Sequence, residues 1–256
     1  MPRSSLLLQT LRDFRRPALR WGLGWLSFGL LLFIFLPLLR LPPSGWFGDW
    51  QVQLAGSRGW LSWLAGLGLG ILLPLGLGIQ AACAGGQLLT VEREGGLLAL
   101  LLASPLPRTR LYDEKIAAFL TWFLLQGLAM GLLFEIYAAA FGLELAFGRV
   151  LLSVLFALAL GLIAGWVALL ASILGADQRQ AVGWGLLGLF LIGLHSLAAS
   201  IWPLNWLKVS SLLQAAASGG ILQSQPFGWP ALLLLGVGLL LLWLARAAFS
   251  RRDLEI

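Results

Sequence analysis

Charge, cysteine and histidine are all scarce in this 256-residue chain, and each scarcity excludes a class of protein. Only 11% of the residues are charged, whereas soluble domains carry about 25%, which excludes a water-soluble globular domain. Cys83 is the single cysteine, so an internal disulfide and a multi-cysteine metal site are excluded. His195 is the single histidine, which excludes a paired-histidine metal motif. We expect no metal site, and we interpret Cys83 as a small buried apolar residue.

Motifs of ATP binding and of catalysis are missing as well. Neither Lys115 nor Lys208 follows a glycine, so the phosphate-binding pattern GxxxxGK(S/T) is absent. The chain also has no HExxH pair, and we therefore expect no enzyme activity and no cofactor of its own. The net charge of +6 does not indicate nucleic acid, because basic residues in membrane proteins report topology and contact with anionic lipid.

Long apolar runs dominate what is present. Hydrophobic residues make up 59% of the chain, and stretches such as LLLFIFLPLL do not alternate as the strands of a membrane barrel do. At 1.5 Å per residue, even the shortest run covers nearly 30 Å, about the thickness of the hydrocarbon core. We predict an all-α polytopic membrane protein with six transmembrane helices, at residues 21–39, 60–82, 116–134, 150–174, 181–202 and 228–245.

The basic residues predict the orientation. With the N-terminus inside, thirteen arginines and lysines fall on the cytoplasmic side and four on the other, as the positive-inside rule requires. We therefore place the chain in the cytoplasmic (inner) membrane with both termini in the cytoplasm. Residues 1–20 are predicted to form an interfacial helix on the cytoplasmic side; a loose basic tail is the alternative. Residues 203–227 form an extracytoplasmic segment, and 1–256 is one transmembrane domain.

A few polar or small residues inside the runs are candidates for function or packing. GWGLLG at 183–188 allows close helix approach. His195 lies within the fifth span and could bind a substrate group or haem, or only hydrogen-bond to a neighbouring helix. Glu135 and Glu144 flank the outer end of the third span, where we expect a re-entrant or surface turn that exposes them to water. His195 and Glu135 are the candidates for a substrate path.

The cytoplasmic segment 83–115 is the unusual part of the chain. Residues 90–115, TVEREGGLLALLLASPLPRTRLYDEK, contain eight of the 28 charged residues. The apolar stretch after Gly96 has eight residues, too few to cross a membrane, and prolines close it. This pattern predicts a short helix against the cytoplasmic face, with charged ends presented to a soluble partner. An ordinary loop that satisfies the positive-inside rule is the alternative.

The same segment resembles the permease subunits of type-2 (ABC-2-type) ABC exporters. The resemblance rests on Glu-Arg-Glu-x-Gly, an apolar helix, Ser-Pro-Leu-Pro-Arg and a lysine that opens the next span. The resemblance implies that this segment couples the permease to an ATPase. The residues implied in coupling are Glu92, Arg93, Glu94, Gly95, Gly96, Ser104, Pro105, Pro107, Arg108 and Lys115. The chain departs from the family at Glu114, where glycine is frequent, and in reading Gly-Leu-Leu-Ala where the family often has Gly-Thr-Leu-Glu.

The resemblance implies a function and a set of partners. The segment would be a coupling helix held in a groove of a separate ABC ATP-binding subunit, which would carry the ATP and Mg. The permease would pair with a second copy of itself, or with a paralogous permease, within membrane lipid, and would move substrate by alternating access. A haem-exporter-like channel subunit of cytochrome c maturation has a similar pattern and remains an alternative. A non-transporting membrane scaffold is another, and it would need no coupling helix.

Overall fold

A computed structural model of the chain describes Arg12, Arg15, residues 19–25, Ser27 and residues 72–96, 107–140, 147–201 and 229–251. The described residues are helical apart from short turns, and no strand occurs among them, so the predicted all-α class is confirmed. Their long helices are α4 (Leu73–Glu94), α6 (Arg108–Ala140), α7 (Phe147–Ile173), α8 (Gln178–Ile201) and α11 (Trp229–Arg251). A short helical stretch at 19–25 coincides with the start of the first predicted span.

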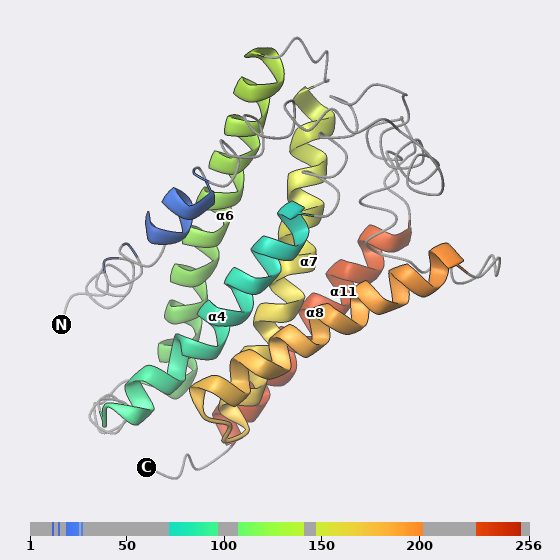
Figure 1. Cartoon of the computed structure of the whole chain (residues 1–256). Coiled ribbons are helices and arrows are strands. Elements are labelled where there is room, and N and C mark those ends of the chain that lie inside the picture. The colour runs from blue at the N-terminus through green and yellow to red at the C-terminus, as the bar shows by residue number, and fades with distance from the viewer. Residues whose placement is uncertain are drawn as a thin grey trace.

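The helices run alternately down and up in one bundle (Figure 1). Helix α4 packs chiefly against α7, and these two occupy the middle of the bundle. In the view of Figure 1, α6 lies to one side of this pair, while α8 and α11 lie on the other. The end of α4, the start of α6, the end of α7 and the start of α8 gather at the lower end. This arrangement brings the helix ends that flank the α4–α6 and α7–α8 connections to the same end of the bundle.

Glycine allows the central helices to approach one another closely. A Cβ atom at Gly85 of α4 would lie 2.2 Å from the carbonyl oxygen of Gly165 in α7. A Cβ at Gly185 of α8 would lie 2.7 Å from the carbonyl oxygen of Ala164 and 2.8 Å from Cβ of Ala82. Gly185 of the GWGLLG pattern therefore packs helices within this chain, as small residues do between helices in membranes.

The turns at the lower end follow from local sequence. Helix α4 ends where Gly96 adopts φ +70°, and α7 is followed by Gly175 with φ +102°, a left-handed conformation that glycine adopts without strain. Helix α8 begins after Asp177, whose Oδ1 accepts a hydrogen bond of 2.7 Å from the N–H of Gln180, which is the usual role of an N-cap side chain.

Two helices extend beyond the predicted spans. Helix α4 continues past residue 82 to Glu94, and α6 begins directly after Pro107. At its other end α6 continues to Ala140, so the predicted surface turn at Glu135 is wrong, because the helix does not break before the run of alanines. Glu144, much of the segments 1–20 and 21–39, and all of 203–227 lie outside the described residues.

Membrane-capable helices account for much of the described fold. Three of them are long and apolar enough to cross a membrane, at Arg108–Tyr137, Val150–Ile173 and Leu232–Arg251. Helix α4 is less apolar because it carries two glutamines and ends in three charged residues. Helix α8 opens with Gln-Arg-Gln. The described residues thus form an all-helical bundle with three membrane-capable helices, as expected of a membrane protein.

Candidate functional site: a charged hub at the end of helix α4

The last three residues of α4 each contact a different helix. We call Glu92, Arg93 and Glu94, with the groups they bind, the charged hub. Glu92 binds α6, Arg93 binds the end of α7, and Glu94 binds the start of α8. Three consecutive residues of a helix point in three directions about 100° apart, which is why one short stretch reaches three neighbours. The hub immediately precedes the predicted coupling helix.

Glu92 forms an ion pair with Lys115 of α6. The lysine side chain is only 4% exposed, whereas the glutamate side chain is 27% exposed. The Lys115 Nζ atom also donates a hydrogen bond of 3.1 Å to the carbonyl oxygen of Leu88 in α4. A buried ammonium is tolerated only when charge and hydrogen bonds replace its lost water. The Glu92 carboxylate and the Leu88 carbonyl oxygen therefore stabilise Lys115 together.

Arg93 and Glu94 complement the ends of the next two helices. The Arg93 guanidinium donates to the carbonyl oxygens of Ser172 at 3.4 Å and Ala176 at 2.7 Å, at the end of α7. The exposed Glu94 carboxylate accepts a hydrogen bond of 3.3 Å from the backbone N–H of Gln178, the first residue of α8. A cation at a helix C-terminus and an anion at a helix N-terminus both oppose the helix dipole favourably. The hub therefore satisfies orphan backbone groups at the turn between α7 and α8.

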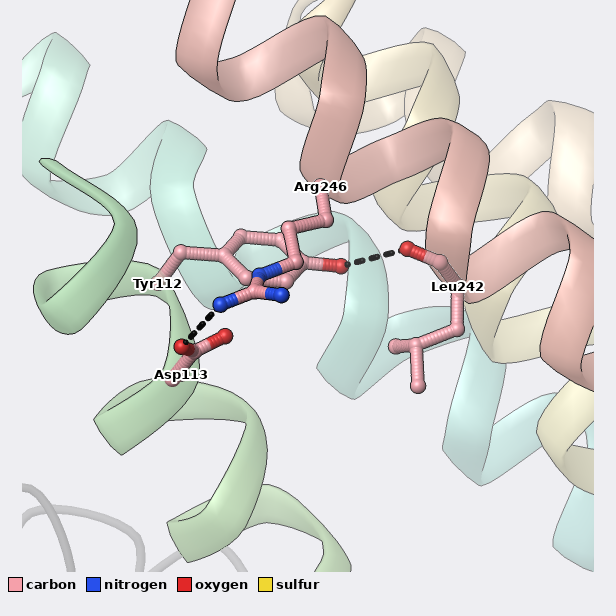
Figure 2. A network of polar contacts seen from close by, with 4 residues as sticks. All are labelled: Tyr112, Asp113, Leu242 and Arg246. Atoms are coloured by element: carbon pink, nitrogen blue, oxygen red, sulfur yellow. Dashed lines mark hydrogen bonds and ion pairs between the residues drawn. The ribbon is translucent and has the colours of Figure 1, made fainter.

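A second polar link joins α6 to α11 at the same end of the bundle (Figure 2). The Arg246 guanidinium lies 2.7 Å from the Asp113 carboxylate, and the Tyr112 hydroxyl donates to the carbonyl oxygen of Leu242 at 3.3 Å. The Tyr112 ring also packs on Phe249, with centroids 5.7 Å apart. The start of α6 is thus held by α4 on one side and by α11 on the other.

Higher in the bundle, two glutamines form a buried pair between α4 and α6. The Gln80 amide donates to Oε1 of Gln126 at 2.5 Å, and the Gln126 amide donates back to Oε1 of Gln80 at 3.0 Å. Their residues are 5% and 8% exposed. Because each amide supplies the donor that the other needs, the pair is satisfied without water. The sequence prediction missed it, although a glutamine in each of two apolar stretches was a usable signal.

The predicted coupling residues lie at one end of the bundle, as far as they are described. Gly95 and Gly96 form the turn after α4, and the carbonyl of Pro107 accepts the first hydrogen bonds of α6, from the N–H groups of Arg110 and Leu111. Arg108 is the first residue of α6. Ser104 and Pro105 lie outside the described residues.

The two predicted substrate-path residues do not join this site or each other. His195 is half-buried on α8, about 25 Å along the helix from its first residue at 1.5 Å per residue. Glu135 lies on α6, on the other side of the bundle in Figure 1. Its Oε1 atom is buried and has no hydrogen-bond partner within the part of the chain that the structure describes. Cys83 is half-buried on α4 rather than fully buried.

The described residues contain no cluster of three or more histidine, cysteine, aspartate or glutamate side chains that could hold a metal ion. Comparisons of the chain with known protein families, with curated proteins and with solved structures find no match.

Proposed function

We propose that the chain is the membrane-spanning permease subunit of an ATP-driven ABC exporter. A separate ATP-binding subunit would bind ATP and Mg and act on residues 97–106, the stretch between α4 and α6. A second permease, identical or paralogous, would complete the transporter. This proposal joins the sequence resemblance to a physical requirement: force applied to a short external segment must reach several helices at once.

The charged hub is the observation that supports the proposal. Residues 97–106 are attached at one end to Glu94 through two glycines and at the other end to α6 through Pro107. Any displacement of α4 at this point acts on α6 through Glu92, on α7 through Arg93 and on α8 through Glu94. An ordinary topogenic loop needs positive charge on one side of the membrane, but it has no need of contacts that tie four helices together.

Six spans with both termini in the cytoplasm form part of the proposal. The alternating directions of α4, α6, α7, α8 and α11 in Figure 1 are compatible with five successive crossings after the first predicted span. The lower end would then face the cytoplasm and the ATPase. A reporter that is active only outside the cytoplasm should remain silent when fused to the C-terminus, and a signal from it would refute the orientation.

The direct test is assembly with an ATPase. We would co-express the tagged chain with candidate ABC ATP-binding proteins from the same genome, purify the complex and measure vanadate-sensitive ATP hydrolysis. The informative variant is Glu94→Arg, because Glu94 is exposed and Asp177 still caps α8 when Glu94 is changed. Glu92→Arg is unsuitable, since it would place a second cation beside the buried Lys115 and impair folding.

Arg251→Glu is the matched control, because it reverses an exposed charge at the same end of the bundle but outside the hub. We expect Glu94→Arg to lose most of the co-purified hydrolysis while eluting as a folded protein, and Arg251→Glu to retain it. A well-folded unaltered chain that brings down no ATPase would overturn the proposal and favour a membrane scaffold.

A further inference from the structure

Paired polar side chains join α4 and α6 at two heights along the bundle. We call this contact the α4–α6 seam. At the lower level Glu92 pairs with Lys115, and at the upper level Gln80 pairs with Gln126. Lys115 and Gln126 are eleven residues apart, about three turns and 17 Å of helix, so they project from the same face of α6. Helix α6 therefore directs one polar group toward α4 at each of the two levels.

Aromatic rings occupy α6 between the two polar levels. Phe119 and Phe123 are both buried and stack with centroids 5.6 Å apart. Trp166 of α7 meets Phe119 edge to face at 5.5 Å. The lower half of α6 thus presents, from its start upward, a charged group, aromatic faces and an amide.

Directly above the amide pair the packing of α6 changes. A Cβ atom at Gly127 would lie 2.5 Å from Cδ1 of Leu158, and one at Gly131 would lie 3.2 Å from Cγ2 of Val154, both in α7. This tight contact can act as a pivot, since shape-matched surfaces do not slide without a loss of packing. The amide pair lies just below the pivot, so it would form the upper end of an opening that widens toward Lys115. The polar side chains at and below the amide pair can instead replace their bonds to each other by hydrogen bonds to water, so that little hydrogen bonding is lost.

We propose that the α4–α6 seam is the part of the bundle that opens in the transport cycle, and that Gln80 and Gln126 then line the path of the cargo. This inference rests on the proposed function. Residues 97–106 connect the lower ends of the two helices that form the seam, so a force on them changes the separation of those helices most directly. Helix α11 contacts α6 through Asp113 and Tyr112, but it packs more extensively against α7.

The lining defines the class of cargo. An open seam offers two amides, each with donors and an acceptor, about midway across a hydrocarbon core of roughly 30 Å. Aromatic faces lie directly below them. Such a surface binds an amphiphile whose head group carries hydroxyl, amide or phosphate oxygens and whose chain packs on the rings. A wholly apolar cargo would leave the amides without partners, and the site would disfavour it.

Opening can be measured by the access of water to position 80. In a Cys83→Ser background, the chain would carry Gln80→Cys with Gln126 kept, so that one amide still wets the seam when it opens and the thiol can take part in its hydrogen bond. The complex with its ATPase, in vesicles of phosphatidylethanolamine and phosphatidylglycerol, would be treated with a charged methanethiosulfonate with and without ATP and vanadate. Since minor conformations are commonly populated at 0.1–10%, we expect trapping to change the labelling rate by about tenfold or more.

Leu77→Cys in the same background is the matched control. Leu77 lies one turn from Gln80 but is fully buried against α7, where its backbone is 3.1 Å from a Cβ built at Gly161. Its labelling should stay slow in both states. If position 80 also stays slow in both states of a complex that hydrolyses ATP, the inference is wrong while the proposed function stands. If no ATPase co-purifies, the proposed function fails and the inference fails with it.

A second variant separates lining from mere structural support. Gln80→Leu with Gln126→Leu replaces the amide pair by an apolar contact that packs well when the seam is closed but resists wetting when it opens. We expect the double variant to keep its thermal midpoint while ATP turnover falls by about tenfold, because the open state becomes rare. Unchanged turnover in a stable double variant would assign the glutamines a structural role only and overturn the inference.

Discussion

Helix α4 contacts its neighbours in two different ways. Toward α7 and α8 the contact is backbone on backbone, with Gly85 against the carbonyl oxygen of Gly165 and Gly86 close to Val182. Toward α6 the contact is made by long side chains, with the Gln80–Gln126 pair and the Glu92–Lys115 pair. The first contact excludes almost any added atom, whereas the second depends on groups that can also be satisfied by water.

The difference teaches which parts of the bundle can move relative to one another. Van der Waals contact between helices is lost within about 1 Å of separation, so α4, α7 and α8 form a unit that moves together. Polar pairs tolerate separation when water enters, and their strength depends on which partner remains buried. The charged hub takes part in both kinds of contact, because it ties α4 to α7 and α8 and also to α6.

Enlarging the glycine contact should have the largest effect. Gly85→Leu would force a side chain into the space of the Gly165 carbonyl, where even a Cβ lies 2.2 Å from the oxygen. Overpacking costs typically 1–3 kcal/mol and more when backbone must shift, so we expect loss of the folded protein, measured as the monodisperse fraction in detergent. Gly236→Leu on α11, where nothing lies within 4 Å of the Cβ, is the control.

A folded Gly85→Leu protein with an unchanged thermal midpoint would show that α4 and α7 can separate there. The distinction between a rigid α4–α7 contact and a separable α4–α6 contact would then be wrong. Loss of both variants would instead mean that the outer face of α11 is also packed in the membrane, and that Gly236 is not an open position.

The sequence predicted much of this architecture but little of the site's internal chemistry. Periodic apolar runs were sufficient for the all-α class and placed the ends of α7 within three residues. The segment around Glu92 to Glu94 was predicted to present charge to a partner, which stays a prediction; its contacts within the bundle were not predicted. The contacts of Arg93 with Ala176 and of Glu92 with Lys115 join residues far apart in the chain, and spacing alone carries no information on such pairs.

The end of α6 shows a different limit. Glu135 was expected to end the helix because a charge in an apolar run is costly. The helix continues, because the surrounding residues are strong helix formers and one carboxylate does not break backbone hydrogen bonding. The polarity of a residue therefore predicts the free-energy cost of burying its side chain better than it predicts where a helix ends.

The ion pair of the hub should show an intermediate and asymmetric effect. Glu92→Leu leaves Lys115, which is 4% exposed, without its carboxylate, whereas Lys115→Met leaves Glu92, which is 27% exposed and can reach water. Removing one partner of a buried pair costs about 3–5 kcal/mol. We expect a loss near 3 kcal/mol for Glu92→Leu and about 1 kcal/mol for Lys115→Met, measured by reversible unfolding in mixed micelles.

The double variant Glu92→Leu with Lys115→Met sharpens the test. It removes both charges and should recover most of the stability lost in Glu92→Leu, since apolar replacement of a buried pair is often neutral. Equal losses in the two single variants would mean that the lysine reaches water as readily as the glutamate. The hub would then be a surface feature and not part of the separable contact.

The exposed pair of α6 and α11 should show the smallest effect. The side chains of Arg246 and Asp113 are 52% and 49% exposed, and pairs of this kind contribute less than about 1 kcal/mol. We expect Arg246→Gln to lower the thermal midpoint slightly at low salt and not at all at 1 M salt, where the screening length falls to about 3 Å. A large, salt-independent loss would mean that this pair is shielded in the membrane and holds α11 to α6 as firmly as Glu92 holds Lys115. In that case α6 and α11 would resist separation at their lower ends, and the swing of α6 about Gly127 would have to carry α11 as a rigid partner.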